Sequence, residues 1–240
     1  MSETSAKSWV KLRQVVIATT SHDDDVDLVR QAFGLGKGFC DPELDSLHMV
    51  DATMPVARGQ YLEFIGPASD EAAVLKWLTK IGGRGGYVLS VQHPDPAAVK
   101  QRAIERGIRV PVDVEALGHP VIQLHPQDVG LLLEVDGITD PERWFWDDID
   151  SGPEADAAVS EIVSVQVPVA DPAATNALWH DLLDLGTPAE PTVIEMGGIS
   201  VEFVAGGPSA EWTVTLRRAD SAAGASAAAP SLAGLRFELV

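Results

Sequence analysis

The chain has one cysteine, few basic side chains and no long apolar run. Cys40 alone cannot form an intramolecular disulfide, which is typical of proteins in a reducing cytoplasm. Seventeen Lys and Arg against thirty-six Asp and Glu leave a net charge of −19, so nucleic-acid and membrane-surface partners are not expected. No run reaches the ~18 apolar residues of a membrane span, and MSETSAKSW lacks the apolar core of a signal peptide. We therefore expect a cytoplasmic protein.

Several familiar catalytic motifs are also missing. The sequence contains no Ser–His–Asp nucleophile motif and no paired-cysteine zinc pattern. The stretch GGRGG lacks the Lys-Ser/Thr ending of a phosphate-binding loop, which favours a connector between a helix and a strand. What the 240 residues do offer is 45% apolar composition, enough to bury a sizeable core.

The strongest pattern is an internal repeat. Each copy has an apolar β-type run, a capped helix start, and further β-type runs that end with an acid inside a strand. Three sets of residues mark the copies: strand positions Gln14, Val88 and Ser164, helix caps Ser21, Asp95 and Asp171, and closing acids Glu63, Glu134 and Glu202. The strand positions lie 74 and 76 residues apart and the acids 71 and 68, so the period is near 70 residues. This indicates duplicated modules.

The repeat predicts an α+β fold of tandem βαβββ modules that form a cupped mixed sheet, with a third module and a truncated fourth. The expected boundaries are a paired domain over 1–138 (module one about 10–67, connecting helix 70–82, module two about 85–137), an acidic linker over 139–158, and a third module plus partial fourth over 159–240. We expect no partner module for the third copy. Trp144 and Trp146 are expected to pin the linker to a domain face, the alternative being a platform for a ligand.

The paired modules resemble the vicinal oxygen chelate superfamily (the glyoxalase, bleomycin-resistance and extradiol-dioxygenase group), and are most similar to a glyoxalase-like branch of largely uncharacterised function. The segments that carry the resemblance lie between about 12 and 137: LRQVVIATT, MPVARGQYLEFIGP, GGRGGYVLSVQHPDPAAVKQRAIERGIRV and QLHPQDVG. This superfamily includes lyases, isomerases, epimerases, dioxygenases and drug-sequestering binders, so the resemblance implies the fold more closely than the function.

The resemblance also implies a site. In this superfamily four inward residues, from the first and last strands of both modules, chelate one divalent metal such as Mn, Fe, Zn, Ni or Co. The corresponding positions here are Gln14, Glu63, Val88 and Glu134. The usual pattern has histidine at the first and third positions, and valine cannot bind a metal. The chain thus keeps both acids and loses both histidines, so the expected cofactor is one divalent metal or none.

Three nearby residues are further candidates. A register shift of one residue would place the phenol of Tyr87 in the cup. His125 is either a ligand or general base near Glu134, or a turn histidine that holds HPQD by a backbone hydrogen bond. His48 either faces the cup as a substrate-binding residue or has a structural role. Glu63 and Glu134 would be ordinary solvent-side strand residues in the alternative reading.

Two functions follow from these residues. The first is a glyoxalase-like enzyme, an isomerase, epimerase or lyase that moves a proton on a small oxygenated molecule, carbonyl or hydroxy-carbonyl and possibly aromatic. It would use Glu134, Glu63, His125 or Tyr87, with a metal on Gln14, Glu63 and Glu134 or with buried acids alone. The second is a non-catalytic protein that binds or sequesters a small molecule, as in the drug-resistance relatives. A homodimer is a further expectation.

Overall fold

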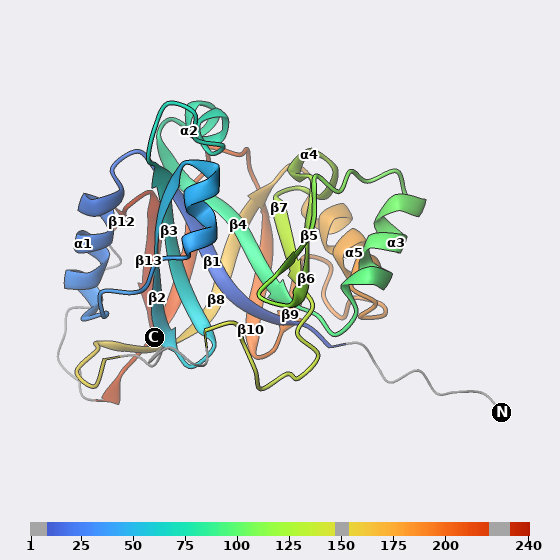
Figure 1. The fold of residues 1–240 in the computed structure, drawn as a ribbon. Helices are drawn as coiled ribbons and strands as arrows, with labels where there is room; N and C mark the ends of the chain where they lie inside the picture. Colours follow the sequence, from blue (N-terminus) through green and yellow to red (C-terminus); the bar gives the residue numbers. More distant parts are fainter. Residues whose placement is uncertain (1–8, 147–153, 221–230) are drawn as a thin grey trace.

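The computed structural model describes residues 9–146, 154–220 and 231–240, and shows two mixed β-sheets with helices at their flanks (Figure 1). The seven-stranded sheet has the order β2-β3-β1-β4-β7-β6-β5, with bounds β1 Lys11–Thr19, β2 Met49–Ala57, β3 Gln60–Pro67, β4 Arg84–Gln92, β5 Val112–Ala116, β6 His119–Leu124 and β7 Leu132–Asp136. The six-stranded sheet has the order β12-β13-β11-β8-β10-β9, with bounds β8 Val159–Val169, β9 Val193–Met196, β10 Ile199–Ala205, β11 Trp212–Arg218, β12 Ser231–Leu232 and β13 Leu235–Leu239.

The strand pairing confirms the predicted α+β fold of tandem modules. In the first sheet β1 is parallel to β3, β4 is parallel to β7, and β1 and β4 join the two modules antiparallel. Val15 pairs with Leu89 at the middle of that junction, so the modules are related by a pseudo-twofold rotation about this point. Residues at equivalent positions of the two modules therefore face the same side of the sheet from opposite directions.

Module two is the one complete βαβββ unit among the described residues. In module one, Phe39 forms an isolated bridge to Thr53 and the 3₁₀ helix η1 (Pro42–Leu47) follows, where module two has strand β5. Pro42 and the cap Asp41, whose side chain accepts from the Glu43 N–H, favour a helical turn over a strand there. The third module is likewise built from β8, α5, β9 and β10.

The expectation that the third module has no partner is wrong. Strand β8 pairs antiparallel with β11, and β11 pairs parallel with β13, which repeats the arrangement around β1, β4 and β7. Strand β11 has apolar residues at every second position, Trp212, Val214 and Leu216, and these side chains are buried, so its sequence is typical of a strand. Residues 147–153 of the predicted linker and 221–230 of the predicted fourth module lie outside the described residues.

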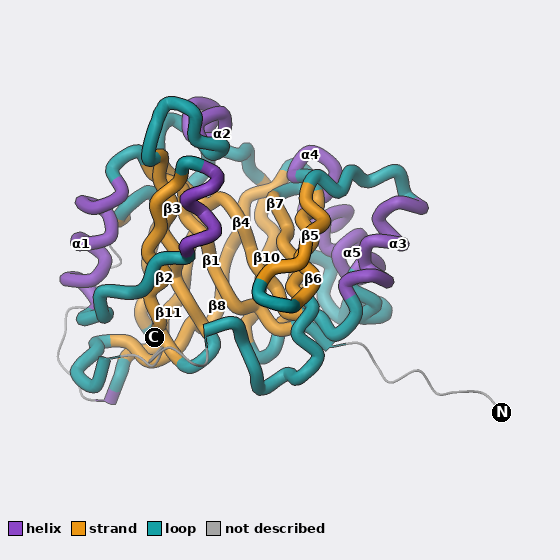
Figure 2. The backbone as a smooth tube through the Cα atoms, in the orientation of Figure 1, coloured by secondary structure: helices purple, strands orange, loops and turns teal. Residues whose placement is uncertain are grey.

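The helices α1 (His22–Phe33), α3 (Pro96–Glu105) and α5 (Pro172–Leu182) flank the sheets, while α2 (Leu75–Ile81) and the short α4 (Pro126–Val129) lie at one end (Figure 2). Asp95 and Asp171 accept hydrogen bonds from the Ala98 and Ala174 N–H groups, and a proline follows each, as the sequence predicts. Ser21 begins α1 without a side-chain cap bond. Among the described residues, no helix has the length and apolar character to cross a bilayer.

The main core lies between the two sheets. Alternate side chains of β1, such as Val15 and Ile17, are fully buried together with Val165 and Val167 of β8. The remaining side chains of β1 (Gln14, Val16 and Ala18 among them) point to the opposite face, which is the concave face of the predicted cup. The sheets thus pack with this face turned outward.

The two sheets pack tightly at Gly86. A Cβ atom built there would lie 2.0 Å from the Trp212 ring. We predict that Gly86→Ala lowers the free energy of unfolding by about 2–3 kcal/mol, because the indole is packed and cannot withdraw. Urea unfolding followed by circular dichroism measures the change. The matched control is Gly207→Ala, where a Cβ would meet nothing within 4 Å. Equal stability of the two variants would contradict the packing described here.

Candidate functional site

The concave face of the first sheet encloses a cavity of about 650 Å³. Its floor is formed by side chains from β1, β3, β6 and β7, and its walls by η1, the β5–β6 hairpin and the segment after β7. The residues that line it are Gln14, Asp41, Glu43, Ser46, Leu47, Glu63, Val112, Val114, Glu115, Ala116, Leu117, Val121, Gln123, Glu134, Asp136, Phe145 and Trp146. The cavity thus combines an acidic floor with an apolar and aromatic rim.

The two predicted acids lie on this floor at equivalent places. Glu63 on β3 accepts a hydrogen bond from Gln14 Nε2 at 2.5 Å, and Glu134 on β7 accepts one from Gln123 Nε2 at 2.7 Å. Because β3 and β7 are separated by β1 and β4, the two glutamates reach the cavity from opposite sides of the cup. The structure therefore places Gln14, Glu63 and Glu134 in the lining of one cavity.

A third floor acid was missed by the sequence reasoning. Asp136 lies two residues after Glu134, so strand alternation places it on the same face, and Ser90 Oγ donates to its Oδ2 at 2.6 Å. Gln123 was missed as well, although it lies directly opposite Glu134 in the β6–β7 pairing. The alternation of EVD at the end of β7 was a signal that could have identified Asp136.

Burial without a neighbouring cation sets the electrostatics of the floor. Desolvation raises the pKa of Glu63 well above its usual value, and the charges of Asp51, Glu134, Asp41 and Asp136 raise it further. The pKa of Asp136 is also raised well above its usual value by desolvation and by Glu134. Desolvation raises the pKa of Glu134 too, while hydrogen bonds from Gln123 and Ser90 oppose that shift. Burial therefore favours the protonated form of each floor acid.

One wall of the cavity is held by Asp51 on β2. Both carboxylate oxygens of this buried side chain accept from the Asp41 N–H at 3.0 Å, and so fix the start of η1. Desolvation is the main cause that raises the pKa of Asp51 to about 6. This contact places Asp41 and Glu43 at the rim.

The opposite wall is clamped by Arg13. Its guanidinium donates to Gln92 Oε1, to the Gly59 carbonyl and, at 2.8 Å, to the Pro141 carbonyl, and it lies 5.4 Å from the Trp144 ring. Gln92 in turn donates to the carbonyls of Ile138 and Asp140 at 2.9 and 2.8 Å. These bonds fix the segment that carries Phe145 and Trp146 against the cavity. Trp144 thus helps to hold this segment against the sheet, as expected, and Trp146 lines the cavity.

The other predicted site residues lie elsewhere. His125 is the N-cap of α4 and its Nδ1 accepts from the Gln127 N–H at 3.2 Å, which is the turn role rather than a catalytic one. His48 ends η1 with φ 55° and faces Glu71 with an exposed side chain. The structure brings neither histidine to the cavity lining.

Tyr87 and Val88 are both on the concave side. The β1–β4 register pairs Val16 with Val88 and Ile17 with Gly86, which leaves Tyr87 as an extra residue in a bulge. Val88 packs in the cluster beneath α2, and Tyr87 packs on Trp77 with ring centroids 5.8 Å apart. Desolvation, and then the Glu134 charge, raise the pKa of Tyr87. The phenol is near Glu134 but does not line the cavity.

The donor set does not fit the divalent metal that the resemblance implies. Val88 is apolar and packed, Gln14 turns its amide N–H toward Glu63, and no group of three or more His, Cys, Asp or Glu in the described residues is arranged to hold a metal.

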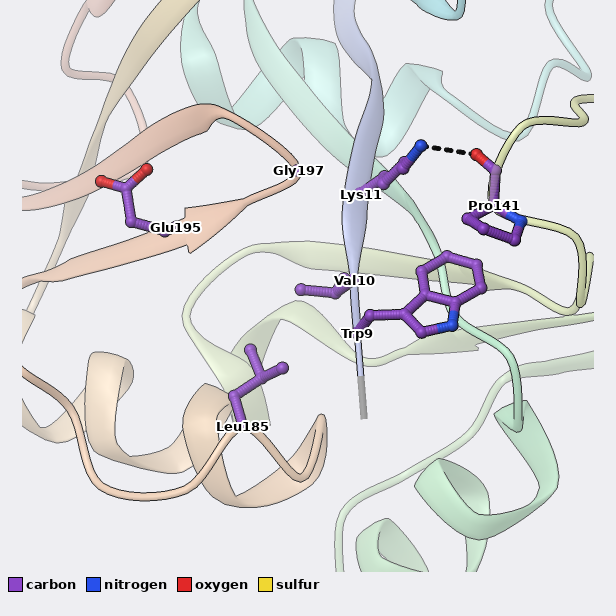
Figure 3. A pocket seen from close by; sticks show the side chains of 7 residues that line it. All are labelled: Trp9, Val10, Lys11, Pro141, Leu185, Glu195 and Gly197. Atoms are coloured by element: carbon purple, nitrogen blue, oxygen red, sulfur yellow. Dashed lines mark hydrogen bonds between the residues drawn. The ribbon is translucent and has the colours of Figure 1, made fainter. Parts of the chain in front are cut away.

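A second cavity of about 350 Å³ lies at the start of β1 (Figure 3). It is lined by Trp9, Val10, Lys11, Pro141, Leu185, Glu195 and Gly197, and Lys11 Nζ donates to the Pro141 carbonyl at 2.6 Å. Its single acid, Glu195, accepts from Ser200 at 2.5 Å. Acids do not converge here as they do on the cup floor.

Comparisons with known proteins give partial similarities to solved structures. No family model and no curated protein matches the chain. A Streptomyces coelicolor methylmalonyl-CoA epimerase variant in complex with 2-nitronate-propionyl-CoA is 24% identical with a TM-score of 0.47, over 52% of this chain and 95% of the epimerase. The Mycobacterium tuberculosis methylmalonyl-CoA epimerase is 22% identical with a TM-score of 0.47, over 55% of this chain and 90% of that chain. A hypothetical protein from Bacillus halodurans is 22% identical with a TM-score of 0.48, over 56% and 99%.

The raised pKa of Glu63 makes a prediction about stability. A carboxyl that binds its proton more tightly when folded makes the free energy of unfolding fall as pH rises above the usual value of 4.5. We expect the free energy of unfolding of Glu63→Gln to fall less steeply with pH than that of the wild type, by up to about 1.4 kcal/mol per pH unit, which corresponds to one titrating proton. Below pH 4.5 we expect the slopes of the two proteins to be similar. Urea titrations from pH 4 to pH 8 measure the slope.

The control for this measurement is Glu202→Gln. Glu202 occupies the equivalent strand position in the second sheet and accepts from Gln166 Nε2 at 2.8 Å, but its side chain is half-exposed. An equal change of slope in both variants would contradict a special environment of Glu63.

The likeness to solved structures concerns the fold alone, and the strand pairing establishes independently that this fold is one of tandem, cupped α+β modules.

Proposed function

We propose that the protein catalyses proton transfer at a carbon next to a carbonyl group in a small molecule, as an epimerase or isomerase, with Glu63 and Glu134 as acid and base. One observation carries this proposal: the buried Glu63 and the half-buried Glu134, each held by an amide N–H, enter one cavity from equivalent positions of opposed modules. Groups on both sides of a bound carbon are what inversion of its configuration requires.

The spacing of the strands supports two opposed groups. Three inter-strand steps separate β3 from β7, roughly 14 Å along a flat sheet at about 4.8 Å per step. The curvature of the cup and the length of two glutamate side chains shorten the gap between the carboxyls. A small molecule is thus able to sit between them, with one face toward each.

The electrostatics support unequal protonation of the pair. Like charges in a desolvated site do not ionise together, so the floor acids share protons rather than all carrying charge. In the proposed reaction the ionised glutamate removes the proton from carbon, and the C–H electron pair moves into the enolate. The protonated glutamate then returns its proton to the opposite face of the same carbon. The proton balance is closed, and the two side chains have exchanged roles.

The enolate oxygen needs a hydrogen-bond donor. The indole N–H of Trp146 belongs to a buried side chain of the cavity wall, and Nε1 has no hydrogen-bond partner among the described residues. Asp136 in its protonated form is a second donor on the floor. Both groups would take part only when a ligand oxygen enters.

If the two glutamates act on opposite faces of the carbon, a variant of one glutamate should lose inversion of configuration but keep hydrogen exchange in one enantiomer. With chiral 2-aryl ketones and thioesters in D₂O, we expect the wild type to exchange the hydrogen next to the carbonyl in both enantiomers and to invert them. Glu63→Gln should reduce inversion by about 10³-fold or more, yet keep exchange in the one enantiomer whose hydrogen faces Glu134. Glu134→Gln should show the opposite preference.

Proton NMR and chiral chromatography follow exchange and inversion separately. The control is Glu202→Gln, which leaves the cavity intact. Loss of exchange in both enantiomers with either variant would contradict two opposed bases. Retention of full inversion in both variants would contradict a role for either glutamate.

The metal expected from the resemblance stays a prediction, and the donor set leads us to propose proton transfer by the acids alone. We expect metal well below one equivalent per chain in mass spectrometry of protein purified without chelator or nickel, and unchanged exchange activity after treatment with EDTA. Near-stoichiometric metal that is lost in Glu134→Ala would contradict this proposal and establish a chelate site.

The apolar rim favours a second candidate function, binding without catalysis. Val114 and Leu117 of the β5–β6 hairpin are 53% and 60% exposed at the mouth of the cavity, which suits capture of an apolar molecule. Binding without any hydrogen exchange in the assay above would favour this alternative. The expected homodimer and cytoplasmic location stay predictions.

A further inference from the structure

The charges that line the large cavity restrict the ligands it can take. Six of its lining residues are acids: Asp41, Glu43, Glu63, Glu115, Glu134 and Asp136. Among the described residues, none that lines it is Lys, Arg or His. Three of the acids form the floor and three lie at the rim, so an entering molecule passes one set of carboxylates before it reaches the other.

Nearby basic groups do not offset these acids. Arg13 is held by Gln92 and by backbone carbonyls behind the aromatic wall. On the hairpin side, Lys100 pairs with Asp113, and Arg109 donates to Asp128 at 2.7 and 2.8 Å. The net charge of −19 adds a long-range field of the same sign. A sulfonate, phosphate or carboxylate group would therefore enter without a counter-charge.

The remaining surface of the cavity is suited to an uncharged body. Phe145 and Trp146 form an aromatic wall, and Leu47, Val112, Val114 and Leu117 supply aliphatic surface. Gln14 and Gln123 also line the cavity, and their side-chain amide N–H groups are donors that suit a carbonyl oxygen. Apolar walls with a few convergent polar groups are the usual composition of a small-molecule site.

We infer that the cavity admits uncharged or cationic small molecules with an apolar body and an acceptor oxygen, and excludes anions, including phosphate-bearing thioesters. In the proposed reaction these molecules would be the substrates, and only this consequence rests on the proposed function. The exclusion itself comes from the walls of the cavity and holds for a binding protein as well.

A matched pair of fluorescent probes tests the inference. N-phenyl-1-naphthylamine is uncharged, and 1-anilinonaphthalene-8-sulfonate has the same ring scaffold with one added sulfonate. Both increase in fluorescence in apolar cavities. We expect the uncharged probe to bind at least about tenfold more tightly at low salt, with the gap narrowing as salt screens the rim. Equal binding, or tighter binding of the sulfonate, would overturn the inference, as would binding of neither probe.

Two variants locate the effect. Glu43→Lys combined with Glu115→Lys reverses charge at two exposed rim positions outside the proposed acid–base pair, and should bring the affinity for the sulfonate to within about threefold of that for the uncharged probe. Ala116→Trp fills the cavity and should abolish binding of the uncharged probe. Failure of the rim variant to improve sulfonate binding would contradict exclusion by charge.

The outcome is distinguishable from failure of the proposed function. Probe binding reports the charge selection of the cavity without any reaction, whereas hydrogen exchange in D₂O reports the chemistry. If the uncharged probe binds more tightly but no hydrogen exchange occurs, the charge selection is supported and the proposed catalytic function is contradicted. If the protein exchanges hydrogen in uncharged ketones but binds the sulfonate probe tightly, the proposed catalytic function is supported and the charge selection is contradicted.

Discussion

The burial of several acids against one cavity, without a cation among the lining residues, is the constraint on which the rest of the site depends. Removing a carboxylate from water is costly unless it is protonated or hydrogen-bonded. Here the donors to the floor acids are neutral: amides bond to Glu63 and Glu134, and the Ser90 hydroxyl bonds to Asp136. Neutral donors lower the cost without supplying a counter-charge, so the protonated forms of the acids are favoured. A desolvated acid that holds a transferable proton is the feature that makes the site chemically active in our proposal.

The duplicated modules place two of these acids opposite one another, but duplication alone does not make a cavity. The second sheet repeats the strand pairing and even the amide-to-acid contact, through Gln166 and Glu202, yet there the acid is half-exposed. The first sheet differs by its walls. Asp51 fixes η1 on one side, and Arg13 fixes the aromatic segment on the other. Those two clamps convert an open strand face into a desolvated site.

The sequence was informative where a residue type has one physical role. Helix-capping Asp95 and Asp171 and the strand acids Glu63 and Glu134 could be located by spacing, because capping and strand alternation follow local rules. The bulge at Tyr87 could not, since it arises from the β1–β4 pairing between distant segments. On sequence His125 fits a turn residue better than a general base without excluding either, and its position as the N-cap of α4 agrees with the turn role. The partner of the third module was missed although Trp212, Val214 and Leu216 alternate along β11, because its pairing with β8 joins segments that are distant in the sequence.

The loss of both expected histidines changes what the two remaining acids are able to do. A bound cation would hold Glu63 and Glu134 ionised, since it stabilises the charged form of its ligands. With Val88 packed under α2 and Gln14 bonded to Glu63, the same acids instead repel one another and are desolvated. In the proposed reaction, that repulsion keeps a proton in the site and leaves the reacting oxygen to hydrogen-bond donors rather than to a Lewis acid. Both of our proposals thus rest on one feature of the cavity: six acids line it, and no basic side chain among the described residues does.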